Sequence, residues 1–103
     1  EERVVDIIKY INGHYAEVTL ENLSENFNLS RPYISKYIKD KTGMNFQDVV
    51  REARMRKART LLKESGHSVE SIAADVGYES VEHFNRLFKK SYGITPVQFR
   101  VQK

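Results

Sequence analysis

The feature that most constrains the fold is a pattern that occurs twice: a short helix, a turn, and a longer capped helix. The first helices align at an offset of 49 residues, and after one extra residue in the second copy the second helices align at an offset of 50. The matched pairs are Thr19 with Ser68, Leu20 with Val69, Leu23 with Ile72, Ser30 with Ser80, Ile34 with Phe84, Ile38 with Phe88, Lys39 with Lys89, and Gly43 with Gly93. A helix pair joined by a turn is a helix-turn-helix, so the sequence predicts two such units.

Apolar residues recur at helical spacing along the whole chain, and no segment alternates as a strand would. The sequence therefore predicts an all-α fold of seven helices, over residues 3–14, 20–27, 31–42, 46–65, 69–76, 81–92 and 96–99. The stripe expected to be buried in the first helix consists of Val4, Ile8, Ile11 and Tyr15. The expected N-caps are Thr19, Ser30, Asn45, Ser68, Ser80 and Thr95. Helix ends are marked by Asn28, Gly43, Gly66, Gly77 and Gly93.

The long helix between the two copies divides the chain into three parts. We expect a first helix-turn-helix subdomain at 1–45, a linker helix at 46–66 and a second subdomain at 67–103, which together make one domain. A solenoid is disfavoured because two copies are fewer than stacked repeats need. About 20 helical residues span about 30 Å. That is close to one turn of B-DNA, about 34 Å, so a single chain could reach two successive major grooves.

Charge is distributed unevenly, although the chain as a whole carries only +3. Residues 1–30 hold two basic and six acidic residues, whereas 31–63 hold ten basic and three acidic residues. A basic middle segment on a compact helical chain suggests a polyanionic partner such as nucleic acid, and the alternative that charge alone leaves open is a solvated charged helix.

The second helix of each copy has an apolar side and a polar side. Inward positions are expected at Ile34, Tyr37 and Ile38 in one copy and at Phe84, Leu87 and Phe88 in the other. A recognition helix enters the major groove with its N-terminal end first. The predicted DNA base contacts are therefore Arg31, Pro32, Ser35, Lys36, Val81, Glu82, Asn85 and Arg86. The predicted DNA backbone contacts are Ser30, Lys39, Arg54, Ser80, Lys89 and Lys90.

The side chains have chemistry that suits these roles. Arg86 and Lys36 can bind guanine, and Asn85 can read adenine. Val81 or Pro32 could pack on a thymine methyl group. Glu82 leaves two alternatives open, because it could accept a hydrogen bond from cytosine or could brace Arg86 four residues on, and the second is favoured.

Other chemistries find little support. No catalytic constellation and no phosphate-binding glycine loop is present, so we expect no enzyme, no catalytic residue and no cofactor. His14, His67 and His83 lack metal-ligand spacing, so no metal site is expected, and His83 should be a partly buried flank residue. The absence of cysteine permits a reducing compartment. We expect no membrane span and no signal peptide, and we interpret the chain as a domain of a longer protein.

Ile72 to Tyr78, His83 to Lys89 and Gly93 to Arg100 form three stretches that together resemble the signature of the AraC/XylS family of bacterial transcription regulators. Residues 54–62 are similar to its linker helix, and 23–34 to its first helix-turn-helix. The resemblance covers about residues 4–101. The departures are Tyr78 where phenylalanine is commoner, His83 where tyrosine often sits, Asn28 in place of the first-turn glycine, and Pro32 at a base-facing position.

The resemblance implies sequence-specific binding of double-stranded promoter DNA, with helices 31–42 and 81–92 in successive major grooves. It also implies an activator that contacts RNA polymerase, a regulatory domain N-terminal to this chain, and a cytoplasmic location at the bacterial nucleoid. The competing hypothesis is a protein-interaction module that holds a partner with the helix-turn-helix scaffold or with the acidic face of the first helix.

Overall fold

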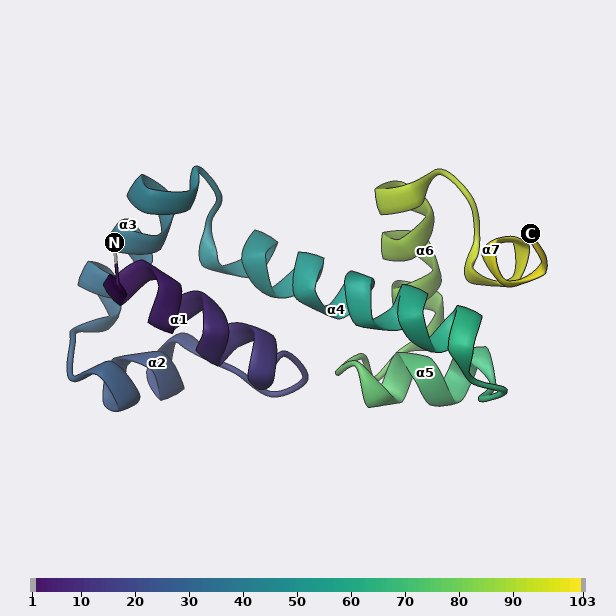
Figure 1. Ribbon diagram of the computed structural model, residues 1–103, viewed down its shortest axis with the longest axis horizontal. Coiled ribbons are helices and arrows are strands. Elements are labelled where there is room, and N and C mark those ends of the chain that lie inside the picture. Colours follow the sequence, from purple (N-terminus) through teal and green to yellow (C-terminus); the bar gives the residue numbers. More distant parts are fainter. Residues whose placement is uncertain (1, 103) are drawn as a thin grey trace. The chain divides into compact units, whose positions relative to one another are not determined.

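The computed structural model describes residues 2–102, which form seven α-helices and no strand. The helices are α1 (Glu2–Gly13), α2 (Leu20–Phe27), α3 (Arg31–Thr42), α4 (Phe46–Glu64), α5 (Val69–Asp75), α6 (Val81–Tyr92) and α7 (Pro96–Val101) (Figure 1). The predicted all-α fold and the predicted number of helices are confirmed.

The chain consists of two compact units, and the boundary between them falls inside α4, between Ala53 and Arg54. The first part of α4 supplies Val49, Val50 and Ala53 to the core of the first unit. The later part buries Met55, Ala58 and Leu62 in the second unit. Each helix-turn-helix therefore packs against its own stretch of α4. The three-part division with a separate linker helix stays a prediction.

The core of the first unit gathers apolar side chains from α1 to α4. Its buried members are Ile7, Ile11, Val18, Leu23, Ile34, Ile38, Val49, Val50 and Ala53. In α1 the buried stripe is centred on Ile7 and Ile11, whereas Val4, Ile8 and Tyr15 are only partly buried. The predicted stripe was thus rotated, because 3.6 residues per turn allow either Ile7 or Ile8 to lie below Ile11.

The second unit has an aromatic core. The ring of Phe88 lies 4.8 Å from that of Tyr92, 5.6 Å from that of Phe99 and 5.9 Å from that of Phe84, measured between centroids. Phe84 and Phe88 are both fully buried. Because neighbouring aromatic rings bury large areas and attract one another at these spacings, this cluster holds α6 in a fixed rotation about its own axis.

The predicted N-cap residues begin six of the seven helices. The hydroxyls of Thr19, Ser30, Ser68, Ser80 and Thr95 each accept a hydrogen bond from a backbone N–H three residues on. The Asn45 side chain does the same for Asp48, over 2.8 Å. Asn28 has φ 57° and ends α2 in the left-handed conformation that glycine usually adopts. The six predicted N-caps are confirmed, as are the helix ends at Asn28, Gly43 and Gly93, whereas α5 ends with Val76 rather than Gly77 as its C-cap.

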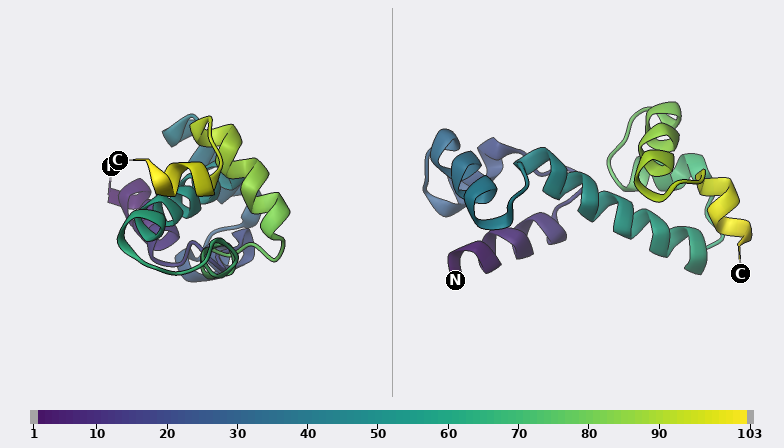
Figure 2. Two further views of the ribbon diagram at one scale, coloured as in Figure 1. Left: turned by 90° about the vertical axis from the view of Figure 1, so that its right-hand side faces the viewer. Right: turned by 90° about the horizontal axis from the view of Figure 1, so that it is seen from above.

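The last helix is tied to the end of α4. Arg100 donates from Nε to the Leu62 carbonyl over 3.0 Å and from a terminal nitrogen to the Ser65 carbonyl over 3.3 Å. Lys63 donates to the Gln102 carbonyl over 2.7 Å. These carbonyls are among those that a helix end leaves without an internal partner. Two further views show α7, in yellow, beside the last turns of α4 (Figure 2).

The burial of three further side chains differs from expectation. Tyr37 and Leu87 are partly buried rather than fully buried, because each lies at the edge of its helix's apolar side. His83 was expected to be partly buried but is exposed, and its ring only meets the edge of the Tyr78 ring at 5.6 Å.

Replacing Phe88 with alanine should lower the free energy of unfolding by about 3–5 kcal/mol, because it removes the centre of the aromatic core and leaves a cavity. Urea denaturation followed by circular dichroism measures this. Val97→Ala on α7 is the control, since Val97 is 60% exposed and should change stability by less than about 0.5 kcal/mol. A similar small loss for both variants would contradict the described core.

Candidate nucleic-acid interface

The second helix of each helix-turn-helix, α3 or α6, turns its polar side away from the core. In α6, Phe84 and Phe88 are fully buried, whereas Glu82, Arg86, Lys89 and Lys90 are exposed. At 3.6 residues per turn, Arg86 lies roughly opposite Phe84. The predicted base contact Val81 is partly buried at the margin of this surface. The burial of α6 therefore leaves a basic surface free along the length of the helix.

The same arrangement recurs in α3. Ile34 and Ile38 are fully buried, and the predicted DNA contacts Arg31, Pro32, Lys36 and Lys39 are exposed. Both helices begin at a serine cap and end at a glycine in the left-handed region, with φ 78° for Gly43 and 83° for Gly93. The internal repeat of the sequence is thus a repeat of structure, and each unit presents one such helix.

Arg86 is a predicted base contact that is exposed in the structure. Its guanidinium forms no hydrogen bond and no ion pair with any of the residues 2–102. Glu82, which was expected to brace it, instead accepts a hydrogen bond from the Ser80 hydroxyl over 3.3 Å. The favoured bracing interaction is therefore wrong in the free chain, because the cap serine lies closer to this carboxylate. All five N–H donors of Arg86 stay available.

Lys36 is the counterpart of Arg86 in α3, but it has a partner. Its ammonium donates to Asp40 over 2.9 Å, one helical turn away. This hydrogen bond, together with the charge of Asp40, raises the pKa of Lys36 above its ordinary value. Sequence reasoning missed Asp40, although a Lys and an Asp four residues apart on a helix signal such a pair.

Asn85 and Ser35 occupy matching positions at the edges of their helices. The side-chain oxygen of Asn85 is enclosed and has no hydrogen-bond partner within residues 2–102. Ser35 is partly buried and lines a surface pocket of about 380 Å³ with Thr19, Leu20 and Phe46, among others. Reading adenine needs both the oxygen and the nitrogen of an asparagine amide. The role predicted for Asn85 therefore requires its side chain to turn outward.

The predicted backbone contacts fall into two groups. Lys89 and Lys90 are exposed at the C-terminal end of α6, and Lys39 lies at the matching end of α3, where its ammonium donates to the Gly43 carbonyl over 3.3 Å. The remaining three take part in local structure. Ser30 and Ser80 cap their helices, and the Arg54 guanidinium lies 5.0 Å from the centre of the Tyr78 ring, a cation–π contact.

Tyr33 is a surface residue that sequence reasoning left outside the site. It is 49% exposed on α3, one turn before Tyr37, and the two rings stack with centroids 6.1 Å apart. Tyr33 lies in the first turn of α3, between the predicted contacts Pro32 and Ser35. This position is the only feature of the sequence that indicates a place for Tyr33 in the site.

Residues 2–102 contain no group of three His, Asp or Glu side chains that could hold a metal ion. None of the helices formed by these residues is long and apolar enough to cross a membrane.

Comparison with known proteins gives a consistent result. A family described as a helix-turn-helix domain matches residues 23–102. The chain is 33% identical over 101 residues to the HTH-type transcriptional activator RhaS of Escherichia fergusonii, with 97% of this chain and 36% of that protein covered. It thus spans about a third of the length of the curated relatives that it matches.

Solved structures agree in fold over nearly the whole chain. The C-terminal domain of the two-component response regulator yesN from Fusobacterium nucleatum is 39% identical, with a TM-score of 0.84 and with 95% of this chain and 98% of that chain covered. The C-terminal domain of AraT, a response regulator from Geobacillus stearothermophilus, is 35% identical with a TM-score of 0.87, and 94% of this chain and 82% of that chain are covered.

Replacing Asp40 with asparagine should strengthen binding to duplex DNA by about two- to tenfold, because it frees Lys36 and removes one repulsive charge. Stability should be nearly unchanged, since the Lys36–Asp40 pair is exposed and solvent screens it. Fluorescence anisotropy with a labelled duplex measures the affinity, and Asp6→Asn on α1 is the matched control. Weaker binding by Asp40→Asn than by Asp6→Asn would show that Asp40 orients Lys36 instead of competing for it.

Proposed function

Since the chain belongs to the AraC/XylS family of helix-turn-helix transcription regulators, we propose that it reads promoter DNA with two recognition helices. In this proposal α3 and α6 each place an N-terminal half in a major groove. Arg31, Pro32, Ser35 and Lys36 face the bases at one groove. Val81, Glu82, Asn85 and Arg86 face them at the other. No enzymatic step is part of the proposal.

The exposed and unpaired guanidinium of Arg86 carries the proposal. A guanidinium in the first half of a groove-entering helix can make a bidentate contact to guanine, the commonest specific contact in protein–DNA complexes. Since it has no partner to give up within residues 2–102, its binding to a base costs no broken ion pair. The basic residues further along the helix, Lys89 and Lys90, would then meet phosphates.

The length of α4 supports reading two successive grooves. Its 19 residues correspond to about 28 Å of helix, at about 1.5 Å per residue. One turn of B-DNA is about 34 Å, and recognition helices of a dimer are spaced by that distance. Because the two helices differ in sequence, the two halves of the DNA site would differ as well, and no palindrome is required.

The rest of the protein's role is inferred from its relatives. RhaS is named as a transcriptional activator, and yesN and AraT are named as response regulators. We propose that this chain likewise serves an activator at the bacterial nucleoid, controlled by a regulatory domain N-terminal to it. Contact with RNA polymerase belongs to the same proposal.

Arg86→Ala should cost about 1–3 kcal/mol of binding free energy and relax the preference at one base pair. Binding is measured by anisotropy against the preferred duplex and against the set of its single-base-pair variants. An equal loss on every duplex would make Arg86 a phosphate contact.

Lys89→Ala is the matched control on the same helix. It should weaken binding to all duplexes alike and should reduce the slope of log K against log salt by about one. Retention of the full slope would remove Lys89 from the set of backbone contacts.

A further inference from the structure

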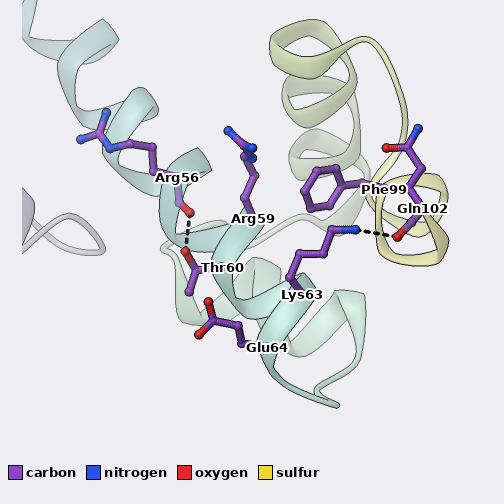
Figure 3. Close-up of a pocket in the computed structure, with 7 residues that line it drawn as sticks. All are labelled: Arg56, Arg59, Thr60, Lys63, Glu64, Phe99 and Gln102. Carbon is purple, nitrogen blue, oxygen red and sulfur yellow. Dashed lines mark hydrogen bonds between the residues drawn. The ribbon is translucent and has the colours of Figure 1, made fainter.

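The second unit contains a basic pocket whose residues take no part in the proposed reading of DNA. Its volume is about 460 Å³, and it lies between the last turns of α4 and α7. Figure 3 shows its lining: Arg56, Arg59, Thr60, Lys63, Glu64, Phe99 and Gln102. Three of these seven side chains are cationic and one is anionic, so the pocket attracts anions.

Arg59 is held in place by aromatic rings while its donors stay unused. Its guanidinium carbon lies 4.9 Å from the centre of the Tyr92 ring and 5.5 Å from that of Phe99. Within residues 2–102 it makes no hydrogen bond and no ion pair. Stacking restricts the side chain without occupying its N–H groups, so less conformational entropy is lost when a carboxylate binds.

Lys63 adds a second fixed cation beside it. Its ammonium lies 4.7 Å from the centre of the Phe99 ring and donates to the Gln102 carbonyl over 2.7 Å, which leaves two N–H donors. The acid of the pocket does not neutralise the pair, because Glu64 forms no ion pair with any residue of the 2–102 range. Aromatic contacts therefore fix the positions of Arg59 and Lys63, while the pocket carboxylate of Glu64 does not pair with either charge.

The pocket and the reading surface lie on different sides of α6. Arg59 packs on Tyr92, and Phe99 packs on Phe88 with ring centroids 5.6 Å apart. Tyr92 and Phe88 lie on the core-facing half of α6, whereas Arg86 lies on the opposite half. A duplex bound along the Arg86 side would leave the α4–α7 side accessible to another molecule.

We infer that this pocket docks an acidic segment of a protein partner. A carboxylate of the segment binds the edge of the Arg59 guanidinium as a two-bonded pair, and a second carboxylate binds Lys63. An apolar side chain of the segment covers the exposed part of the Phe99 ring. A peptide combines carboxylates with apolar groups in this way, whereas a DNA backbone offers no apolar side chain for Phe99. This role is additional to DNA reading and does not depend on it.

The test uses this chain saturated with duplex DNA and a fluorescein-labelled peptide of about twelve residues, rich in aspartate, glutamate and leucine. The control peptide carries asparagine and glutamine in place of the acids. The acidic peptide should bind at least about tenfold more tightly than the neutral one, since charge-assisted hydrogen bonds are about twice as strong as neutral ones. Arg59→Gln with Lys63→Gln should weaken its binding at least about tenfold. Lys57→Gln, an exposed neighbour on α4 outside the pocket, should change it less than about twofold.

Arg59→Lys separates docking from folding, because it keeps the charge while losing the planar, stacked fork. It should weaken peptide binding by about threefold or more, with an unchanged circular dichroism spectrum. Equal binding of both peptides, or full binding by the double variant, would overturn the inference. So would a double variant that instead loses affinity for DNA together with about two units of salt slope, because the pocket would then hold phosphates. In either case the base preference conferred by Arg86 is measured in a separate experiment, so failure of the pocket inference does not affect it.

Discussion

Burial of two apolar side chains one turn apart orients each recognition helix. In α3 these are Ile34 and Ile38, and in α6 they are Phe84 and Phe88, all fully buried. Fixing one side of a helix also fixes the direction of the opposite side, since successive residues differ by about 100°. The exposure of Arg86 and Lys36 therefore follows from the packing of the core. Loss of these anchors would leave the basic residues in place along the chain but without a common direction.

The predictable part of the fold came from features that act over one or two turns. Caps at Ser30 and Ser80 and left-handed ends at Gly43 and Gly93 depend on backbone hydrogen bonds between near neighbours, so residue type at fixed spacing predicts them. The choice of Ile7 over Ile8 in α1 could not be predicted in this way. Both residues are apolar and adjacent, and the packing of α2 to α4 in three dimensions decides between them.

The candidate site, like the fold, was predictable in part from the sequence. Helical periodicity predicted the exposure of Arg31, Pro32, Lys36, Glu82 and Arg86, but it did not predict that Ser35, Val81 and Asn85 are partly buried. The partners of those residues were harder to assign, because several groups compete for each one. Glu82 had both Ser80 and Arg86 within reach and binds the serine, while Lys36 has Asp40 one turn away. The basic pocket was outside the reach of sequence reasoning, since Arg59 and Phe99 are forty residues apart in the chain.

The central claim is that a single chain reads two different base sequences about one DNA turn apart. Selection of tight-binding duplexes from a random-sequence library, followed by sequencing, measures this directly. The account predicts two enriched blocks of unlike sequence whose centres are about 10–10.5 base pairs apart. Enrichment of one block alone, of two blocks at variable spacing, or of no sequence at all would contradict it.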